Sequence, residues 1–312
     1  MKKWILCIAA TLVVIGCAIG GIAMSILNWD FTKLDTENGE WRQWQFDAAE
    51  VEKISADDKA CVPIRVEESE DNKIHVFAYT TEQLDTNAEL KNGSLNILTK
   101  IKMTHLFSLN MFRGLKTLFN GIVIQLPNGY AGRVELKNGN GSITVSELNF
   151  AGDLLIADSN GSITAEEITA NNLTVTNTNG SIRLEKVNVQ EFLNIKNSNG
   201  SIKAEMVRAL SAEVRGANGR ITLEEVRTEN ELKAGNNNGA IRIEDIFSPN
   251  ILLSNNNGSI KGNIDGRKTD YRIVSNVKNG SSNLGGNADI SRPYLLEAEN
   301  SNGSIKIEFS EK

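Results

Sequence analysis

Histidine and cysteine are scarce in this chain, which has 2 histidines and 3 cysteines among its 312 residues. His75 and His105 have neither a candidate nucleophile nor a metal-binding residue near them in the sequence. Cys7 and Cys17 lie in one apolar run, so Cys61 is the single thiol outside that run and no intrachain disulfide is expected there. No cysteine spacing suits zinc, and no glycine-rich phosphate loop is present. We therefore expect no metal site and no cofactor.

Long apolar runs are also lacking, except for one at the N-terminus. Residues 4–27 carry no charge and are numerous enough to cross a hydrocarbon core of about 30 Å. Lys2 and Lys3 precede the run and Asp30 follows it, so residues 1–3 are expected in the cytoplasm and the rest of the chain outside. The run predicts a single-pass membrane anchor. The alternatives are a cleaved signal peptide and a lipoprotein signal ending at Cys17, after which the sequence stays mostly apolar.

The dipeptide Asn-Gly, by contrast, is abundant and nearly evenly spaced. Its glycines are Gly141, Gly161, Gly180, Gly200, Gly219, Gly239, Gly258, Gly280 and Gly303. Successive steps are 19 or 20 residues, and only the last two are longer, at 22 and 23. Such a period over more than half of the chain indicates stacked coils.

Apolar residues recur at fixed distances from each glycine. The column two residues after it contains Ile143, Ile163, Ile182, Ile202, Ile221, Ile241, Ile260 and Ile305. Other apolar columns lie four and seven residues after the glycine, and five and seven before it. Because a spacing of two is that of strands, residues 134–312 are predicted to form an all-β domain, a right-handed parallel β-solenoid of about nine coils. Independent hairpins would not explain the fixed period, and leucine-rich repeats would require a helical arm.

A second asparagine column lies three residues before most of the glycines. Its members are Asn138, Asn177, Asn197, Asn236, Asn255 and Asn300, with Asp158 as a near-equivalent. Glycine and asparagine tolerate the positive φ angles of a tight corner. The stacked amides of this second column are predicted to hydrogen-bond along the solenoid axis, which makes them structural rather than ligand-binding.

Residues 28–133 lack the repeat and are predicted to form a β-rich cap at the start of the solenoid. Alternation around Ile64 and Val66 and again around Ile74 and Val76, with a polar turn between, predicts a β-hairpin. A basic amphipathic segment at about 100–120 either plugs the first coil or lies on an anionic membrane surface. At the other end, a short strand at 305–309 is expected to close the stack almost alone.

Charged residues form columns as well. Glutamates lie five residues after the glycine, at Glu166, Glu185, Glu205, Glu224, Glu244 and Glu308. Basic residues lie two positions earlier on the same face, at Arg183, Lys203, Arg242, Lys261 and Lys306. The pattern predicts a solvated lattice of ion pairs, with binding of divalent cations or of a polysaccharide as the alternative. Since a glycosidase requires carboxylates in unlike surroundings, we expect no catalytic residue and no enzyme.

The coil that begins at Gly258 departs from the repeat. Gly262 and Asp265 stand where inward aliphatic residues are expected, and Ser282 stands where the next isoleucine is expected. The extra length of this coil falls near 265–272, and insertions in repeat arrays emerge as surface loops. Candidate residues for binding a partner or an anionic polymer are Arg267, Lys268, Tyr271 and Arg272. The alternative is a degenerate coil near the C-terminal end.

The run from Ile122 to Pro127, and the run from Val134 to Ile143 with its following Asn-Gly-Ser-Ile units, resemble the DUF4097 family of bacterial β-strand-repeat proteins. The likeness covers about residues 40–312. Proteins of this family are often labelled adhesins, and they include membrane-anchored envelope proteins of Gram-positive bacteria. The resemblance implies a solenoid outside the cytoplasm and a link to envelope stress, and it transfers no catalytic residue.

These features together predict a non-enzymatic envelope scaffold or adhesin-like binding protein. Its expected partners are the cell membrane, through residues 4–27, and an envelope polymer or another membrane protein. No nucleic-acid partner is expected. A polysaccharide-active β-helix enzyme and an ectodomain that senses for a membrane signalling partner are the alternatives.

Overall fold

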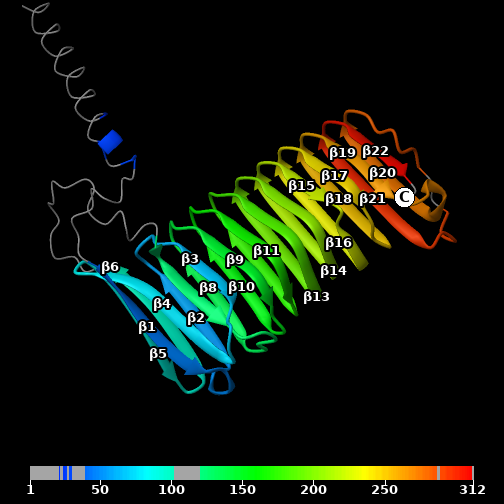
Figure 1. The fold of residues 1–312 in the computed structure, drawn as a ribbon. Coiled ribbons are helices and arrows are strands. Elements are labelled where there is room, and N and C mark those ends of the chain that lie inside the picture. The colour runs from blue at the N-terminus through cyan, green and yellow to red at the C-terminus, as the bar shows by residue number, and fades with distance from the viewer. Residues whose placement is uncertain are drawn as a thin grey trace, which may run out of the picture.

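The computed structural model describes residues 39–101, 120–286 and 289–310, with a few positions between 21 and 29. Its strands join in one 22-stranded sheet that winds into a solenoid of about eight turns (Figure 1). The prediction of an all-β solenoid is confirmed, while its handedness stays a prediction. Within these ranges, no helix has the length and apolar character needed to cross a membrane. The predicted anchor at 4–27 and the amphipathic segment near 100–120 lie almost entirely outside the described residues, so both stay predictions.

Each coil has a first arm before its Asn-Gly corner and a second arm after it. The first arms are β8 (Arg133–Asn138), β10 (Asp153–Asp158), β12 (Asn172–Asn177), β16 (Arg227–Asn238) and β18 (Asn250–Asn257). The second arms are β9 (Ile143–Asn149), β11 (Ile163–Ala170), β15 (Ile221–Glu224), β17 (Ile241–Ile246) and β19 (Ile260–Asp265). Two longer strands, β13 (Ile182–Asn199) and β14 (Ile202–Asn218), run from one corner to the next. Equivalent arms of neighbouring coils pair in parallel.

The apolar columns pack inside the coils as predicted. Ile163 lies opposite Ile143 on one side and Ile182 on the other. All eight isoleucines of the column after the glycine are buried, with at most 2% of their surface exposed. Each coil therefore contributes one layer of aliphatic side chains to a continuous core, and its stability depends on contact with the layers on both sides.

The N-terminal region continues the parallel stack before it reverses direction. β2 (Lys53–Asp58) and β3 (Ile64–Glu68) form a coil beside β8 and β9. On its far side lies a coil of β6 (Ser94–Ile101) and β7 (Ile122–Leu126). β4 (Lys73–Thr81) pairs antiparallel with β7, and β5 (Leu84–Lys91) pairs antiparallel with β6. The predicted hairpin around Ile64 and Ile74 is wrong, because β7 lies between β3 and β4.

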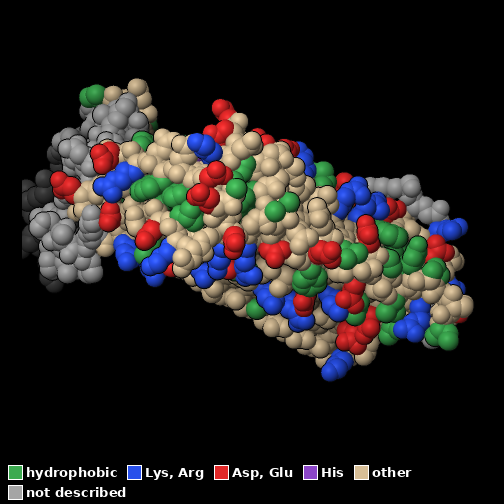
Figure 2. All heavy atoms as spheres, turned by 90° about the horizontal axis from the view of Figure 1, so that it is seen from below, with side chains coloured by type: hydrophobic (Ala, Val, Ile, Leu, Met, Phe, Trp, Pro, Cys, Tyr) green, Lys and Arg blue, Asp and Glu red, His purple; other side chains and the backbone are tan. Residues whose placement is uncertain are grey.

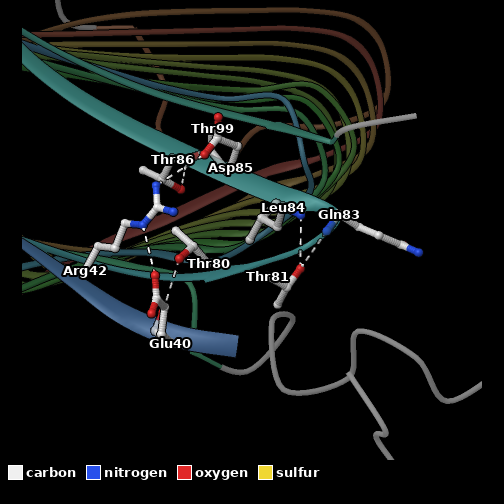
Figure 3. Close-up of polar contacts among 9 residues, drawn as sticks. All are labelled: Glu40, Arg42, Thr80, Thr81, Gln83, Leu84, Asp85, Thr86 and Thr99. Carbon is white, nitrogen blue, oxygen red and sulfur yellow. Dashed lines mark hydrogen bonds and ion pairs between the residues drawn. The ribbon is translucent and has the colours of Figure 1, made fainter. Parts of the chain in front are cut away.

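The first end of the solenoid is closed by β1 (Gly39–Asp47), which pairs antiparallel with β4 and is followed by the 3-10 turn η2 (Ala48–Glu50). Figure 3 shows how polar side chains join the strands of this end. Arg42 of β1 lies 3.4 Å from Glu40 and 3.4 Å from Asp85 of β5. Inside, the hydroxyls of Thr86 and Thr99 bond at 3.1 Å. Antiparallel strands thus replace the parallel pattern at this end.

The C-terminal coil is inserted between two coils that precede it in sequence. β21 (Tyr294–Asn302) pairs with β18 on one side and with β20 (Tyr271–Asn279) on the other, while β22 (Ile305–Ser310) pairs with β19. A bridge from Ser282 to Ile305 lies on the outer side of β22. The prediction that the strand at 305–309 closes the stack is therefore wrong. The coil of β20, preceded by the 3-10 turn η3 (Lys268–Asp270), forms the end instead.

Glycine is required at the corners because neighbouring backbones approach closely there. At Gly239, an added Cβ atom would lie 1.9 Å from the carbonyl oxygen of Gly219, and φ is +131°. No other residue combines this φ angle with the absence of a Cβ atom. The corner glycine is thus a packing requirement as well as a conformational one.

The axial amide ladder is built from a different asparagine column than the sequence suggested. The inner asparagines bond to the backbone, as when Asn236 Nδ2 donates to the Gly219 carbonyl at 2.8 Å. The asparagine of the Asn-Gly dipeptide forms the amide ladder instead, and Asn218 Nδ2 donates to Asn199 Oδ1 at 2.9 Å. This exposed ladder consists of Asn140, Asn160, Asn179, Asn199, Asn218, Asn238, Asn257, Asn302 and Asn279.

A second corner, which the sequence did not reveal, lies six residues after the glycine. The backbone is left-handed there, with φ between 50° and 55°, at Glu147, Glu167, Lys186, Met206, Glu225 and Asp245. These residue types give no signal for positive φ, unlike Asn or Gly. The corner turns the chain between the outward glutamate and the apolar residue that follows, and so fixes the edge of the glutamate face.

Candidate functional site

The outer face of the second arms presents the glutamate column that the sequence predicted. Glu166, Glu185, Glu205, Glu224 and Glu244 lie directly opposite one another in successive coils. Parallel strands are spaced about 4.8 Å apart, so these carboxylates form a row of like charges at that repeat. Isolated, such a row would be destabilising. The neighbouring basic column offsets this repulsion.

Lysine and arginine side chains neutralise the row from the side. Arg183 Nη2 lies 2.5 Å from Glu185, and Lys203 Nζ lies 2.6 Å from Glu205 and 3.0 Å from Glu224. The hydrogen bond from Arg183 lowers the pKa of Glu185, and the two glutamates raise the pKa of Lys203. Figure 2 shows acidic and basic side chains interspersed along one face of the molecule. Because these pairs are solvated, each contributes little to stability.

The ion-paired Glu185 does not resemble the general acid of an acid-base catalyst. A general acid needs a carboxyl whose pKa is raised toward neutrality, whereas the pKa of Glu185 is shifted downward. Among the residues that the structure describes, no cluster of three or more histidine, cysteine, aspartate or glutamate side chains could hold a metal ion. His75 bonds to Asp71 at 2.8 Å, and His105 lies outside the described ranges.

Two carboxylates are buried in the inner corner row, where most coils have asparagine. Asp58 and Asp158 are 2% and 5% exposed and lie on either side of Asn138 in the register of the first arms. Burial raises the pKa of Asp58 to about 6 and also raises the pKa of Asp158. Asp158 Oδ2 has no hydrogen-bond partner within the described structure. The Nδ2 atom of Asn177, one coil later, donates to a glycine carbonyl at 2.7 Å.

Replacing Asp158 by asparagine is expected to stabilise the solenoid at pH 7 by roughly 1 kcal/mol, because the new amide can donate as Asn177 does. A raised carboxyl pKa means that stability is fully present below the ordinary value of 3.8 and is lost as pH rises through the folded-state value. The gain in melting temperature should therefore grow between pH 4 and pH 7. The matched control, Asn177→Asp, should lose stability over the same pH range. A gain that is independent of pH would contradict this account.

The C-terminal insertion does not present its tyrosine to solvent. Tyr271 is fully buried, and its hydroxyl donates to the Ser248 carbonyl at 3.2 Å. Its ring packs against Tyr294 and Phe309, with ring centroids 5.3 and 5.5 Å away, and burial raises the pKa of its hydroxyl. The prediction that the Tyr271 side chain contributes to a binding surface is therefore wrong. Its function is to pack the end of the core.

The basic candidates of the insertion lie nearer the surface. Arg267 and Lys268 are exposed, and Arg272 is half-buried. Arg267 Nε lies 3.2 Å from Asp270. Asp265 forms an ion pair with Arg227, and Ile264 fills the inward position opposite Ile246. The prediction that Asp265 occupies an inward position is wrong, because the strand register shifts there. The proposed binding role of the three basic residues stays a prediction.

The outer face of the first arms has a shallow hollow that sequence reasoning missed. The hollow has a volume of about 240 Å³ and lies over Gly235, where an outward side chain is lacking. Its walls include Arg215, Lys233, Glu297 and Glu299. Arg215 is paired with Glu213 and Lys233 with Glu231. Gly235, a glycine in an outward-facing column, was the sequence feature that could have predicted this hollow. The acidic and basic side chains around it are mixed, so they favour no class of ligand.

Most of the repeat and most of the N-terminal region fall within one family description. The model of the family described as Toastrack DUF4097 matches residues 51–289. The chain belongs to this family. The resemblance to DUF4097 is thereby confirmed, and the match extends over most of the parallel coils and much of the N-terminal region of this Toastrack protein, a shorter range than the expected 40–312.

Comparison with solved structures found four matching chains, three of which are described here. A candidate adhesin from Bacteroides fragilis is 14% identical, with 86% of this chain and 97% of the other covered, at a TM-score of 0.41. A candidate lipid-binding protein from Parabacteroides distasonis is 15% identical, with 88% and 98% covered, at a TM-score of 0.39. A candidate cell adhesion protein from Clostridium sporogenes is 11% identical, with 88% and 100% covered, at a TM-score of 0.23. No relative was found among curated proteins.

Proposed function

We propose that this Toastrack protein is a non-enzymatic binding or scaffold protein of the cell envelope, acting in adhesion or in envelope stress. In this proposal residues 4–27 anchor the chain in the membrane and the solenoid lies outside the cytoplasm. The uncharged run and the preceding Lys2 and Lys3 support this orientation.

The observation that carries the proposal is the uniformity of the glutamate face. Five glutamates occupy equivalent positions in a parallel register, so the same residue type repeats along one outer face at the spacing of the coils. A hydrolase or lyase acting on a polysaccharide needs two carboxylates of unlike pKa. A long regular surface instead suits the support of a partner or the binding of a repetitive polymer.

A binding assay with charge reversal tests the proposal. The protein is incubated with anionic and neutral envelope polysaccharides, and both co-sedimentation and release of reducing ends are measured. We expect retention of an anionic polymer without turnover, and a loss of at least tenfold in affinity for the variant Arg267→Glu with Lys268→Glu. The matched control, Lys196→Glu on the exposed outer face of the first arms, should retain binding.

One outcome would contradict the proposal, and a second would remove only the C-terminal insertion from it. Turnover that a single glutamate substitution abolishes would favour the alternative of a polysaccharide-active enzyme. Unchanged binding by the double variant would remove the insertion from the binding surface. The alternative of an ectodomain that senses for a membrane signalling partner predicts recovery of one membrane protein after cross-linking, without retention by any polysaccharide.

A further inference from the structure

The far end of the solenoid exposes the edge of a regular strand. β20 pairs with β21 on one side, and within the described residues no strand pairs with its other side. A nine-residue edge carries a row of N–H and C=O groups that can template pairing with another chain. Figure 1 places β20 at the end of the stack opposite β1, β4 and β5.

The apolar core at this end is closed by other residues, so the exposed feature is the strand edge itself. Leu284 is only 3% exposed, and Tyr271 packs between Tyr294 and Phe309. The segment that carries Ser282 bridges to β22 on the second arm. A partner at this end therefore has a backbone edge to pair with rather than an apolar cavity to fill.

The outward side chains of β20 are self-complementary in one antiparallel register. Centred on Val274, this register places Val274 opposite its own copy and Arg272 opposite Asn276. Just before the strand, Asp270 at the end of η3 then lies near Lys278, although it also bonds to Arg267 at 3.2 Å within its own chain. The contact between Asp270 and Lys278 occurs twice because the arrangement has two-fold symmetry. Val274 is an apolar side chain with 39% of its surface exposed. Shifting the register by one pair would place Arg272 opposite Lys278, where like charges repel.

We propose that β20 is a self-association edge, which binds β20 of a second copy of this chain in the antiparallel register centred on Val274. The resulting dimer joins two solenoids tip to tip. The place of this dimer in the cell rests on the proposed function. β1, the first strand after the proposed anchor, lies at the end of the solenoid opposite β20. Tip-to-tip pairing would therefore link copies on facing membranes.

Charge reversal at the two ends of the register tests this pairing. The mass of the full chain in detergent micelles is measured by light scattering across a concentration series for Asp270→Lys, for Lys278→Asp, and for the variant with both changes. Each single variant should raise the dissociation constant of the dimer at least tenfold. The double variant, and an equimolar mixture of the two single variants, should restore dimers. The melting temperature of each variant checks that it is folded.

The results separate this pairing from association through the anchor. A protein that stays monomeric at all concentrations would overturn the proposal. Dimers that are indifferent to both single changes would overturn it as well, since association through residues 4–27 does not depend on charges at the tip. Dimers in micelles with the expected charge dependence, but no clustering of vesicles that carry the full chain, would retain the pairing and count against the proposed membrane orientation.

Discussion

Replacing Ile202 by aspartate is expected to unfold the solenoid rather than to loosen one coil. Ile202 is 1% exposed and lies between Ile182 and Ile221 in the isoleucine column. The substitution removes an apolar side chain and leaves a carboxylate in the core without a partner, which together cost about 4 kcal/mol or more. Circular dichroism during urea denaturation should show a transition shifted to much lower urea concentration, or no folded baseline.

The adjacent position provides a matched control for this prediction. Ser201 is exposed and precedes Ile202 at the corner, so Ser201→Asp adds the same charge without burying it. Its free energy of unfolding should change by less than about 0.5 kcal/mol. Equal losses in the two variants would contradict the assignment of this column to the interior.

The second large effect is expected for Gly239→Ala, at the corner where two backbones meet. The added methyl group would lie 1.9 Å from the Gly219 carbonyl oxygen, and the φ angle of +131° is strained for alanine. Neither coil can move without breaking its parallel pairing, so a loss of roughly 3 kcal/mol is expected. Thermal unfolding followed by calorimetry measures it.

Gly139→Ala is the control for this glycine, because no atom lies within 4 Å of its added Cβ position. That variant should keep the stability of the parent protein or gain slightly, since alanine restricts the unfolded chain. A loss at Gly139 as large as that at Gly239 would show that close contact at the corner is not the cause.

The coils and their core were predictable because their signal is local and repeated. The isoleucine columns fix which side of each strand is buried, and the constant period fixes which residues of neighbouring coils meet. The glutamate face was predictable in the same way, because its glutamates recur at a fixed distance from the corner glycine. The two asparagine columns were harder to tell apart, because the period does not show which amide points toward its equivalent in the next coil.

The order of coils at the two ends was not predictable, because the repeat does not show which coils are neighbours there. All coils present similar edges, so the sequence does not show that β21 enters between β18 and β20. The burial of Tyr271 depends on that insertion, because Tyr294 and Phe309 become its neighbours only through it. The hairpin prediction failed for a similar reason. Alternation of apolar and polar residues indicates a strand but does not show which other strand it pairs with.

The central proposal is that the solenoid is displayed outside a membrane that holds its N-terminus. A cysteine placed at the exposed position Ser162, in a chain whose three native cysteines are serine, can be labelled with a membrane-impermeant maleimide on intact cells. We predict equal labelling before and after lysis, with the protein in the membrane fraction. Labelling only after lysis would contradict the claim.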